Sequence, residues 1–106
     1  MKKTKLRDGT VIYCLRKPEA KMLDHHVEGY LQHGIAINDG DVIFDVGANI
    51  GVFGIRALQY GPNVSAYCFE PIPDIAEVLQ KNADSIDKNR MCVFKHGISD
   101  FNTTAS

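Results

Sequence analysis

The sequence has little net charge and no long apolar run, and each absence excludes a class of partner. Among 106 residues, 12 Lys and Arg stand against 13 Asp and Glu, which leaves a formal net charge of -1. Such a chain has no broad positive field to attract nucleic acid. None of its apolar runs approaches the roughly 18 residues that a membrane span needs. We therefore expect neither a nucleic-acid partner nor a membrane.

Cysteine is also scarce and unpatterned. Cys14, Cys68 and Cys92 are odd in number and lack Cys-x-x-Cys spacing. This pattern disfavours a disulfide framework and a zinc site, so no metal site is predicted. The basic N-terminus is not followed by an apolar stretch and does not have the pattern of a secretory signal. The sequence predicts a cytoplasmic protein whose Cys68 and Cys92 are inert core thiols.

The length allows one compact domain, residues 1–106, which we divide at residue 38. In the N-terminal part, Asp8-Gly9 is a turn signal before a β-rich run, and it predicts a short hairpin. Pro18 suits the first turn of a helix that is expected to end near Tyr30. His25 and His26 are adjacent on this helix, so they should point to different faces and not share a metal.

The second part, residues 39–106, alternates short apolar runs with helical patterns. Three runs have the composition of strands buried on both faces: residues 42–46, 64–69 and 91–95. Helical spacing occurs between them, and Asp74 with Glu77 has the spacing of a capping box. This order predicts an α/β fold of Rossmann-like type with three parallel strands and right-handed crossovers.

Three parallel strands are only half of a doubly wound sheet. No later strand is seen that could pair with the free side of residues 42–46. An unpaired strand edge invites pairing with another chain. We therefore expect either a fragment of a larger domain or another chain that covers this edge. An exposed edge would favour a homodimer or aggregation.

A glycine-rich stretch, residues 47–51, joins the first of these strands to the following helix. The dinucleotide fingerprint would need glycines at Asn49 and Val52, so it fails at two of three positions. A phosphate-binding loop is also absent, because no lysine follows Gly51 or Gly54. Asp45, just before the loop, would repel a pyrophosphate but attract the ammonium group of a methionine moiety.

Glu70 closes the next strand and provides the second signal. An acid at this place in nucleotide-binding α/β folds accepts hydrogen bonds from two ribose hydroxyls. Pro71 and Ile72 follow and are predicted to form an apolar wall against adenine. Together, the loop and the acid predict an unphosphorylated adenosine that carries an amino acid, which is S-adenosyl-L-methionine.

Residues 39–51 and 67–73, with 97–100 after the third strand, resemble the FkbM-type methyltransferases. The resemblance covers about residues 25–100 and implies an S-adenosylmethionine-dependent methyltransferase with the Rossmann-like methyltransferase fold. It implies that the acceptor is a small-molecule or sugar hydroxyl. The residues implied to contact the cofactor are Asp45, Gly47, Ala48, Asn49 and Gly51 at the methionine end, Glu70 at the ribose, and Ile98 or Ser99 near adenine. Many related enzymes have an acid where this chain has Ile98.

Plainer roles stay open for each of these residues. Asp45 could bond only loop amides, Glu70 could be a solvated acid before a helix, and Asn49 could be a helix cap. No residue stands out as a general base, so no catalytic residue is predicted. The alternative to an enzyme is a non-catalytic nucleotide-fold fragment or interaction module that needs a partner chain.

Overall fold

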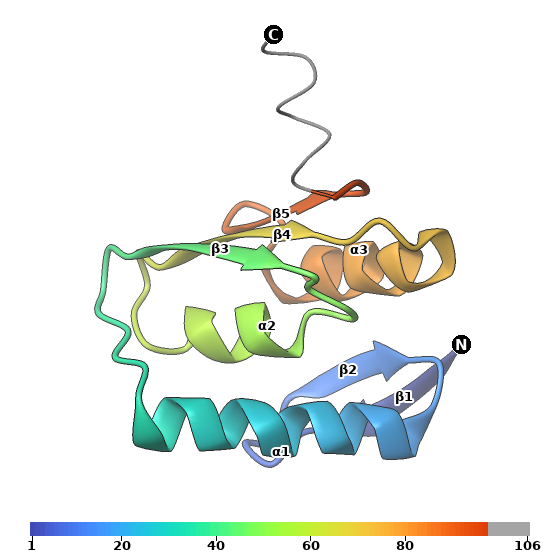
Figure 1. The fold of residues 1–106 in the computed structure, drawn as a ribbon, viewed down its shortest axis with the longest axis horizontal. Helices are drawn as coiled ribbons and strands as arrows, with labels where there is room; N and C mark the ends of the chain where they lie inside the picture. The colour runs from blue at the N-terminus through green and yellow to red at the C-terminus, as the bar shows by residue number, and fades with distance from the viewer. Residues whose placement is uncertain (98–106) are drawn as a thin grey trace, which may run out of the picture.

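The computed structural model describes residues 1–97, which form a hairpin, a long helix and a three-stranded parallel sheet with two helices (Figure 1). The elements follow the chain in this order: β1 Lys2–Lys5, β2 Val11–Cys14, α1 Lys17–His33, β3 Val42–Val46, α2 Val52–Leu58, β4 Ser65–Phe69, α3 Pro73–Asp87 and β5 Met91–Phe94. The predicted α/β class, the hairpin and the number of strands are confirmed.

The larger sheet has the order β3-β4-β5, with both pairs parallel. The register places Asp45 beside Cys68 and Val46 beside Phe69. Both connecting helices, α2 and α3, lie on the same side of the sheet (Figure 1). Because parallel strands align their carboxyl ends, the loop after β3 and the segment after β4 meet at one edge of the fold.

One face of this sheet forms the core with the two helices. Ala66 and Cys68 of β4 are fully buried there, together with Ile55 of α2 and Leu79 of α3. The alternation of side chains along β3 sends Phe44 to the opposite face, where it is 64% exposed and stacks on Tyr67 with ring centroids 5.4 Å apart. That face is not covered by α2 or α3, and β3 lies at the edge of the described sheet.

Helix α1 is held against α2 by ion pairs. The Arg56 guanidinium of α2, whose residue is 9% exposed, binds Asp24 of α1 at 2.6 Å and also binds Glu28 one helical turn later. Asp8, in the hairpin turn, lies 3.6 Å from the same guanidinium. A buried charge with several partners is costly to disrupt, so Arg56 fixes the position of α1 over the loop after β3.

Three local predictions differ from the structure. The strand at residues 42–46 is not buried on both faces: Val42, Phe44 and Val46 are exposed, because neither α2 nor α3 covers that face. Helix α1 begins at Lys17 and continues to His33, with Gly34 at its C-cap, so it is longer than expected. The capping box at Asp74 is wrong: α3 begins at Pro73, Ile72 is the N-cap, and no side chain caps it. Proline supplies a preset φ at the first helical position and has no amide to satisfy, so the helix starts two residues earlier than a cap at Asp74 would place it, without a side-chain cap. No helix within residues 1–97 is long and apolar enough to cross a membrane.

Candidate functional site

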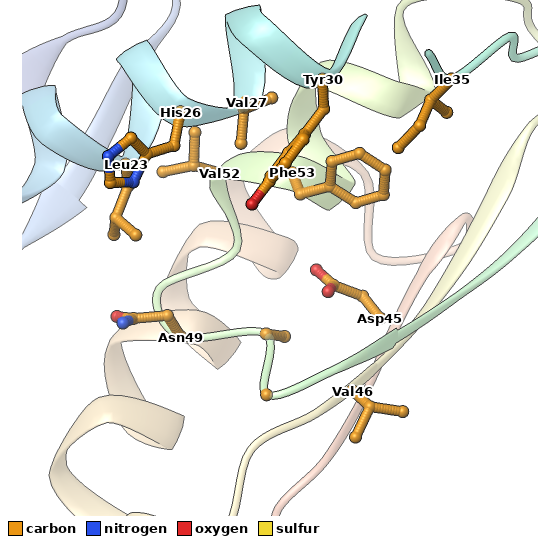
Figure 2. Close-up of a pocket in the computed structure, with 12 residues that line it drawn as sticks. Leu23, His26, Val27, Tyr30, Ile35, Asp45, Val46, Asn49, Val52 and Phe53 are labelled. Carbon is orange, nitrogen blue, oxygen red and sulfur yellow. The ribbon is translucent and has the colours of Figure 1, made fainter.

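A cavity of about 400 Å³ lies between α1, the end of β3 and the start of α2 (Figure 2). Its wall is mostly apolar with a few polar side chains, as expected of a small-molecule site. Twelve residues line it: Leu23, His26, Val27, Tyr30, Ile35, Asp45, Val46, Gly47, Ala48, Asn49, Val52 and Phe53. The predicted residues from Asp45 to Asn49 thus share one wall, and α1 forms the wall opposite.

The loop between β3 and α2 has three residues in the left-handed region. Gly47 has φ 71°, Asn49 has φ 55° and Gly51 has φ 97°. A Cβ on Gly51 would lie 2.8 Å from the side chains of both Leu79 and Met91, whereas a Cβ on Gly47 would meet no atom within 4 Å. Gly51 is therefore needed for core packing, and Gly47 leaves open space on the cavity side.

The loop amides are all satisfied within the protein. Those of Gly47 and Ala48 both donate to the Phe69 carbonyl, at 2.9 and 3.0 Å. The Asn49 amide donates to Oε1 of Glu70. The Ile50 amide donates to the side-chain oxygen of Asn49, and the Gly51 amide donates to the Ala48 carbonyl. Asn49 is therefore not the cap of α2, whose N-cap is Gly51. The loop is preformed, but its amides are not free for a ligand.

Asp45 contributes to the cavity a buried polar atom without a hydrogen-bond partner in the described part of the chain. Its Oδ2 atom is buried and makes no hydrogen bond within residues 1–97. Burial, and secondarily the negative charge of Glu70, raise the pKa of Asp45 to about 6. Native proteins rarely leave a buried carboxylate oxygen unpaired, so this atom marks a place where a ligand donor would bind.

Glu70, rather than Asp45, is the acid that accepts hydrogen bonds from backbone amides at this edge. The residue is only 5% exposed; its Oε1 accepts from the Asn49 amide at 2.8 Å, and its Oε2 accepts from the Ile72 amide at 3.2 Å. Glu70 is therefore not a solvated acid. It ties the loop after β3 to the segment after β4, and each oxygen keeps a lone pair for a further donor.

Asn82 of α3 supports the loop from behind. Fully buried, it accepts from the Tyr13 amide at 2.7 Å and donates to the carbonyls of Tyr13 at 3.0 Å and Ile50 at 2.8 Å. This one side chain joins β2, α3 and the loop. Sequence reasoning placed Asn82 only on a helical face, because its partners are 32 and 69 residues away.

The remaining predicted residues are distributed around this edge of the sheet. Pro71 and Ile72 are exposed directly after Glu70, outside the lining of the cavity. Ile98 and Ser99 lie outside the described residues. The sequence reasoning missed the wall from α1, to which His26 and Tyr30 contribute polar side chains. His26 and Tyr30 are four residues apart on one helix, and Leu23 and Val27 lie at helical spacing on the same side, which was a usable signal.

Other chemistry is not supported in the described part of the chain. Cys68 is fully buried, and burial raises the pKa of its thiol to about 12, so it does not supply a thiolate nucleophile. Residues 1–97 contain no group of three or more His, Cys, Asp or Glu that could hold a metal ion. His25 turns away from His26 to meet Arg7, with Nδ1 2.8 Å from the guanidinium.

Comparison with known proteins finds methyltransferases of similar sequence and of similar fold. No family model matches the chain. It is 38% identical over 82 residues to the 31-O-demethyl-FK506 methyltransferase FkbM of Streptomyces tacrolimicus, a match that covers 74% of this chain and 32% of that protein. The chain thus spans about a third of this relative's length.

Solved structures share the fold at lower identity. The C-terminal domain of precorrin-6Y C5,15-methyltransferase from Rhodobacter capsulatus superposes with a TM-score of 0.66 at 22% identity, over 76% of this chain and 42% of that one. Coclaurine N-methyltransferase bound to N-methylheliamine and SAH superposes with a TM-score of 0.54 at 20% identity. This match covers 82% of this chain and 24% of that one. The chain therefore has the Rossmann-like methyltransferase fold, and its resemblance to the FkbM-type methyltransferases is confirmed.

Proposed function

We propose that this chain binds S-adenosyl-L-methionine as the cofactor-binding part of a methyltransferase. The observation that carries the proposal is the buried, unpartnered Oδ2 of Asp45 beside the open side of Gly47. A ligand ammonium group would satisfy this carboxylate, whose charged form is otherwise disfavoured by burial and, secondarily, by repulsion from Glu70. A pyrophosphate would add negative charge next to two carboxylates, which counts against NAD.

Glu70 fits the ribose of the same ligand. Two amides hold its carboxylate rigidly at the end of β4, and both oxygens can still accept a hydroxyl. Asp45 and Glu70 end neighbouring strands, so an adenosine joined to an amino acid would span the strand ends from β3 to β4. Exposed Pro71 and Ile72 extend from Glu70 as an apolar surface for adenine.

When bound, the cofactor supplies a methyl group on a positively charged sulfur, which is already activated for transfer. The residues of this chain would then act by holding the donor in a fixed orientation, the main requirement of an in-line displacement. We propose a small-molecule hydroxyl as the acceptor, since the FkbM relative is named for a 31-O-demethyl substrate. We assign no general base within residues 1–97.

The test is calorimetric titration of the 106-residue chain with S-adenosylhomocysteine, with NAD as the control ligand. Saturable binding of S-adenosylhomocysteine alone, abolished in Asp45→Asn, is the expected result. Binding of NAD in its place would overturn the proposal. So would unchanged S-adenosylhomocysteine affinity in the Asp45→Asn variant.

A second candidate function is association with another copy of the chain, favoured by the apolar face of β3. Val42, Phe44 and Val46 are 52, 64 and 56% exposed there, at the edge of the sheet. Such a patch is a protein-interaction site or an aggregation hazard. Sedimentation velocity should show a dimer that Phe44→Ser weakens, and a concentration-independent monomer would contradict it. The three free thiols fit a reducing compartment such as the cytoplasm.

A further inference from the structure

The cavity has two walls, and the proposed cofactor site uses only one of them. Asp45 and the loop form the first wall; His26 and Tyr30 of α1 stand on the second. We infer that these two α1 side chains bind the carboxylate of the ligand's amino acid and so select ligands that carry one. This inference rests on the proposed function, because it concerns the same ligand.

The amides of the loop after β3 are already hydrogen-bonded within the protein, and this leads to the assignment. An amino-acid ligand has an ammonium group, for which Asp45 is the partner, and a carboxylate, which needs donors. The five amides from Gly47 to Gly51 already donate to protein acceptors. The carboxylate therefore needs donors from elsewhere in the lining, and a carboxylate buried without donors would be costly.

Helix α1 carries suitable donors at the right place. In Figure 2 the Tyr30 ring extends from α1 toward the end of β3, with the hydroxyl at its tip, and His26 lies one helical turn earlier on the same side. A phenol O–H and an imidazole N–H can each donate to a carboxylate. The opposite wall carries Asp45, so the two ends of an amino acid would face groups of complementary character.

The position of α1 is fixed rather than adjustable. Arg56 binds Asp24 and Glu28, which lie on the side of α1 that faces α2. His26 falls between these two positions in the sequence and therefore points to another face of the helix. The donors are thus held at a set distance from the loop before any ligand arrives, which reduces the ordering cost of binding.

The test uses three ligands with the same adenosine: S-adenosylhomocysteine, its decarboxylated amine, and 5′-methylthioadenosine, which lacks both charged groups. Calorimetry on the 106-residue chain is repeated with Tyr30→Phe and His26→Ala. Tyr60→Phe and His25→Ala are matched controls, because neither residue lines the cavity. Tyr30 is 58% exposed and His26 is exposed, so thermal melts should be unchanged.

Each of the two α1 variants should weaken S-adenosylhomocysteine by about tenfold, the loss of one hydrogen bond to a charged group. Affinity for the decarboxylated amine and for 5′-methylthioadenosine should stay the same. Equal weakening of all three ligands, or none, would overturn the inference and leave the carboxylate to the amides at the start of α2. Absence of S-adenosylhomocysteine binding by the unaltered chain would remove the proposed function and this inference together.

Discussion

Asp45 and Glu70 end neighbouring parallel strands, and their carboxylates have opposite hydrogen-bond states. Glu70 accepts from two backbone amides, whereas the buried Oδ2 of Asp45 has no partner. The charge of Glu70 adds to the burial of Asp45 in raising the Asp45 pKa to about 6. The free protein therefore carries an electrostatic penalty at this site, which a bound cation would relieve.

The penalty predicts that Asp45→Asn stabilises the free chain at neutral pH. A folded-state pKa near 6, raised from 3.8, means that the folded protein holds the Asp45 proton more tightly than the unfolded chain does. Stability due to this group is present below pH 3.8 and is lost as the pH rises through 6. By this shift, Asp45→Asn should raise the free energy of unfolding by about 1–3 kcal/mol at neutral pH.

Urea denaturation of both proteins near neutral pH and near pH 4 measures this directly. The gain from Asp45→Asn should shrink at the lower pH, where the carboxyl is largely protonated in the folded state. The same variant should lose S-adenosylhomocysteine binding, so stability and affinity would change in opposite directions. A gain of the same size at both pH values would mean that its cause is not the charge.

Two glycines of one loop should respond differently to alanine. Gly51→Ala places a Cβ 2.8 Å from Leu79 and Met91 at φ 97°, so both crowding and backbone strain oppose it. We expect it to lower the free energy of unfolding by roughly 2–4 kcal/mol. Gly47→Ala meets no atom within 4 Å and should cost about 1–2 kcal/mol from its positive φ alone.

The effect on ligand affinity should be the reverse: Gly47→Ala, which lowers stability less, should weaken ligand binding more than Gly51→Ala does. Gly47 lines the cavity, and the Cβ of Gly47→Ala would meet no protein atom within 4 Å, so it would take up space that a bound ligand could use. At a temperature where both variants are folded, Gly47→Ala should therefore weaken S-adenosylhomocysteine more strongly. If Gly47→Ala binds like the unaltered chain, the ligand does not approach the loop from this side.

The outline of the fold could be predicted from sequence because it depends on local patterns. Asp8-Gly9 marks the hairpin turn, and the apolar run from Val42 to Val46 marks a strand, although one face of that strand is exposed rather than buried. Helix ends were less predictable, since Pro73 starts α3 without the side-chain cap that Asp74 and Glu77 had indicated. Pro73 at the first helical position and a cap at Asp74 place the start of the helix two residues apart, and local spacing does not show which signal prevails.

The candidate site was predicted only on its glycine-loop side. Asp45 lies near the carboxyl end of a strand and Gly47 directly follows it, and that connection alone places them at the sheet edge. The α1 wall depends on the contact of Arg56 with Asp24, 32 residues away, which no local pattern encodes. Asp45 likewise has no amide partner within residues 1–97 because the Asn49 amide donates to Glu70 instead. The spacing of the two acids in the sequence does not show which of them accepts this hydrogen bond.

Asn82→Leu should loosen the loop as well as the fold. The substitution leaves three buried backbone groups, two of Tyr13 and one of Ile50, without their partner. We expect a loss of about 2–4 kcal/mol in the free energy of unfolding, since buried polar groups without partners are costly. Faster hydrogen exchange of loop amides such as Gly51, in conditions where the variant is folded, would show that the effect reaches the site.

Glu77→Ala is the matched control for Asn82, because Glu77 is exposed on the same helix. It should leave both the free energy of unfolding and the exchange of the loop amides near their original values. If Asn82→Leu lowers stability but leaves loop exchange unchanged, Asn82 supports the fold only. The hydrogen bond to the Ile50 carbonyl would then not be needed to order the loop.

Glu70→Ala should weaken every ligand that carries the ribose, unlike the changes at Asp45. S-adenosylmethionine, S-adenosylhomocysteine and 5′-methylthioadenosine share that sugar, so their affinities should fall by similar factors, about tenfold or more if two charged hydrogen bonds are lost. The substitution also frees the amides of Asn49 and Ile72, so stability should fall by about 1–3 kcal/mol. Asp74→Ala, which removes a nearby exposed acid, is the control. Loss of S-adenosylhomocysteine binding with 5′-methylthioadenosine unaffected would assign Glu70 to the amino-acid end and contradict its place at the ribose.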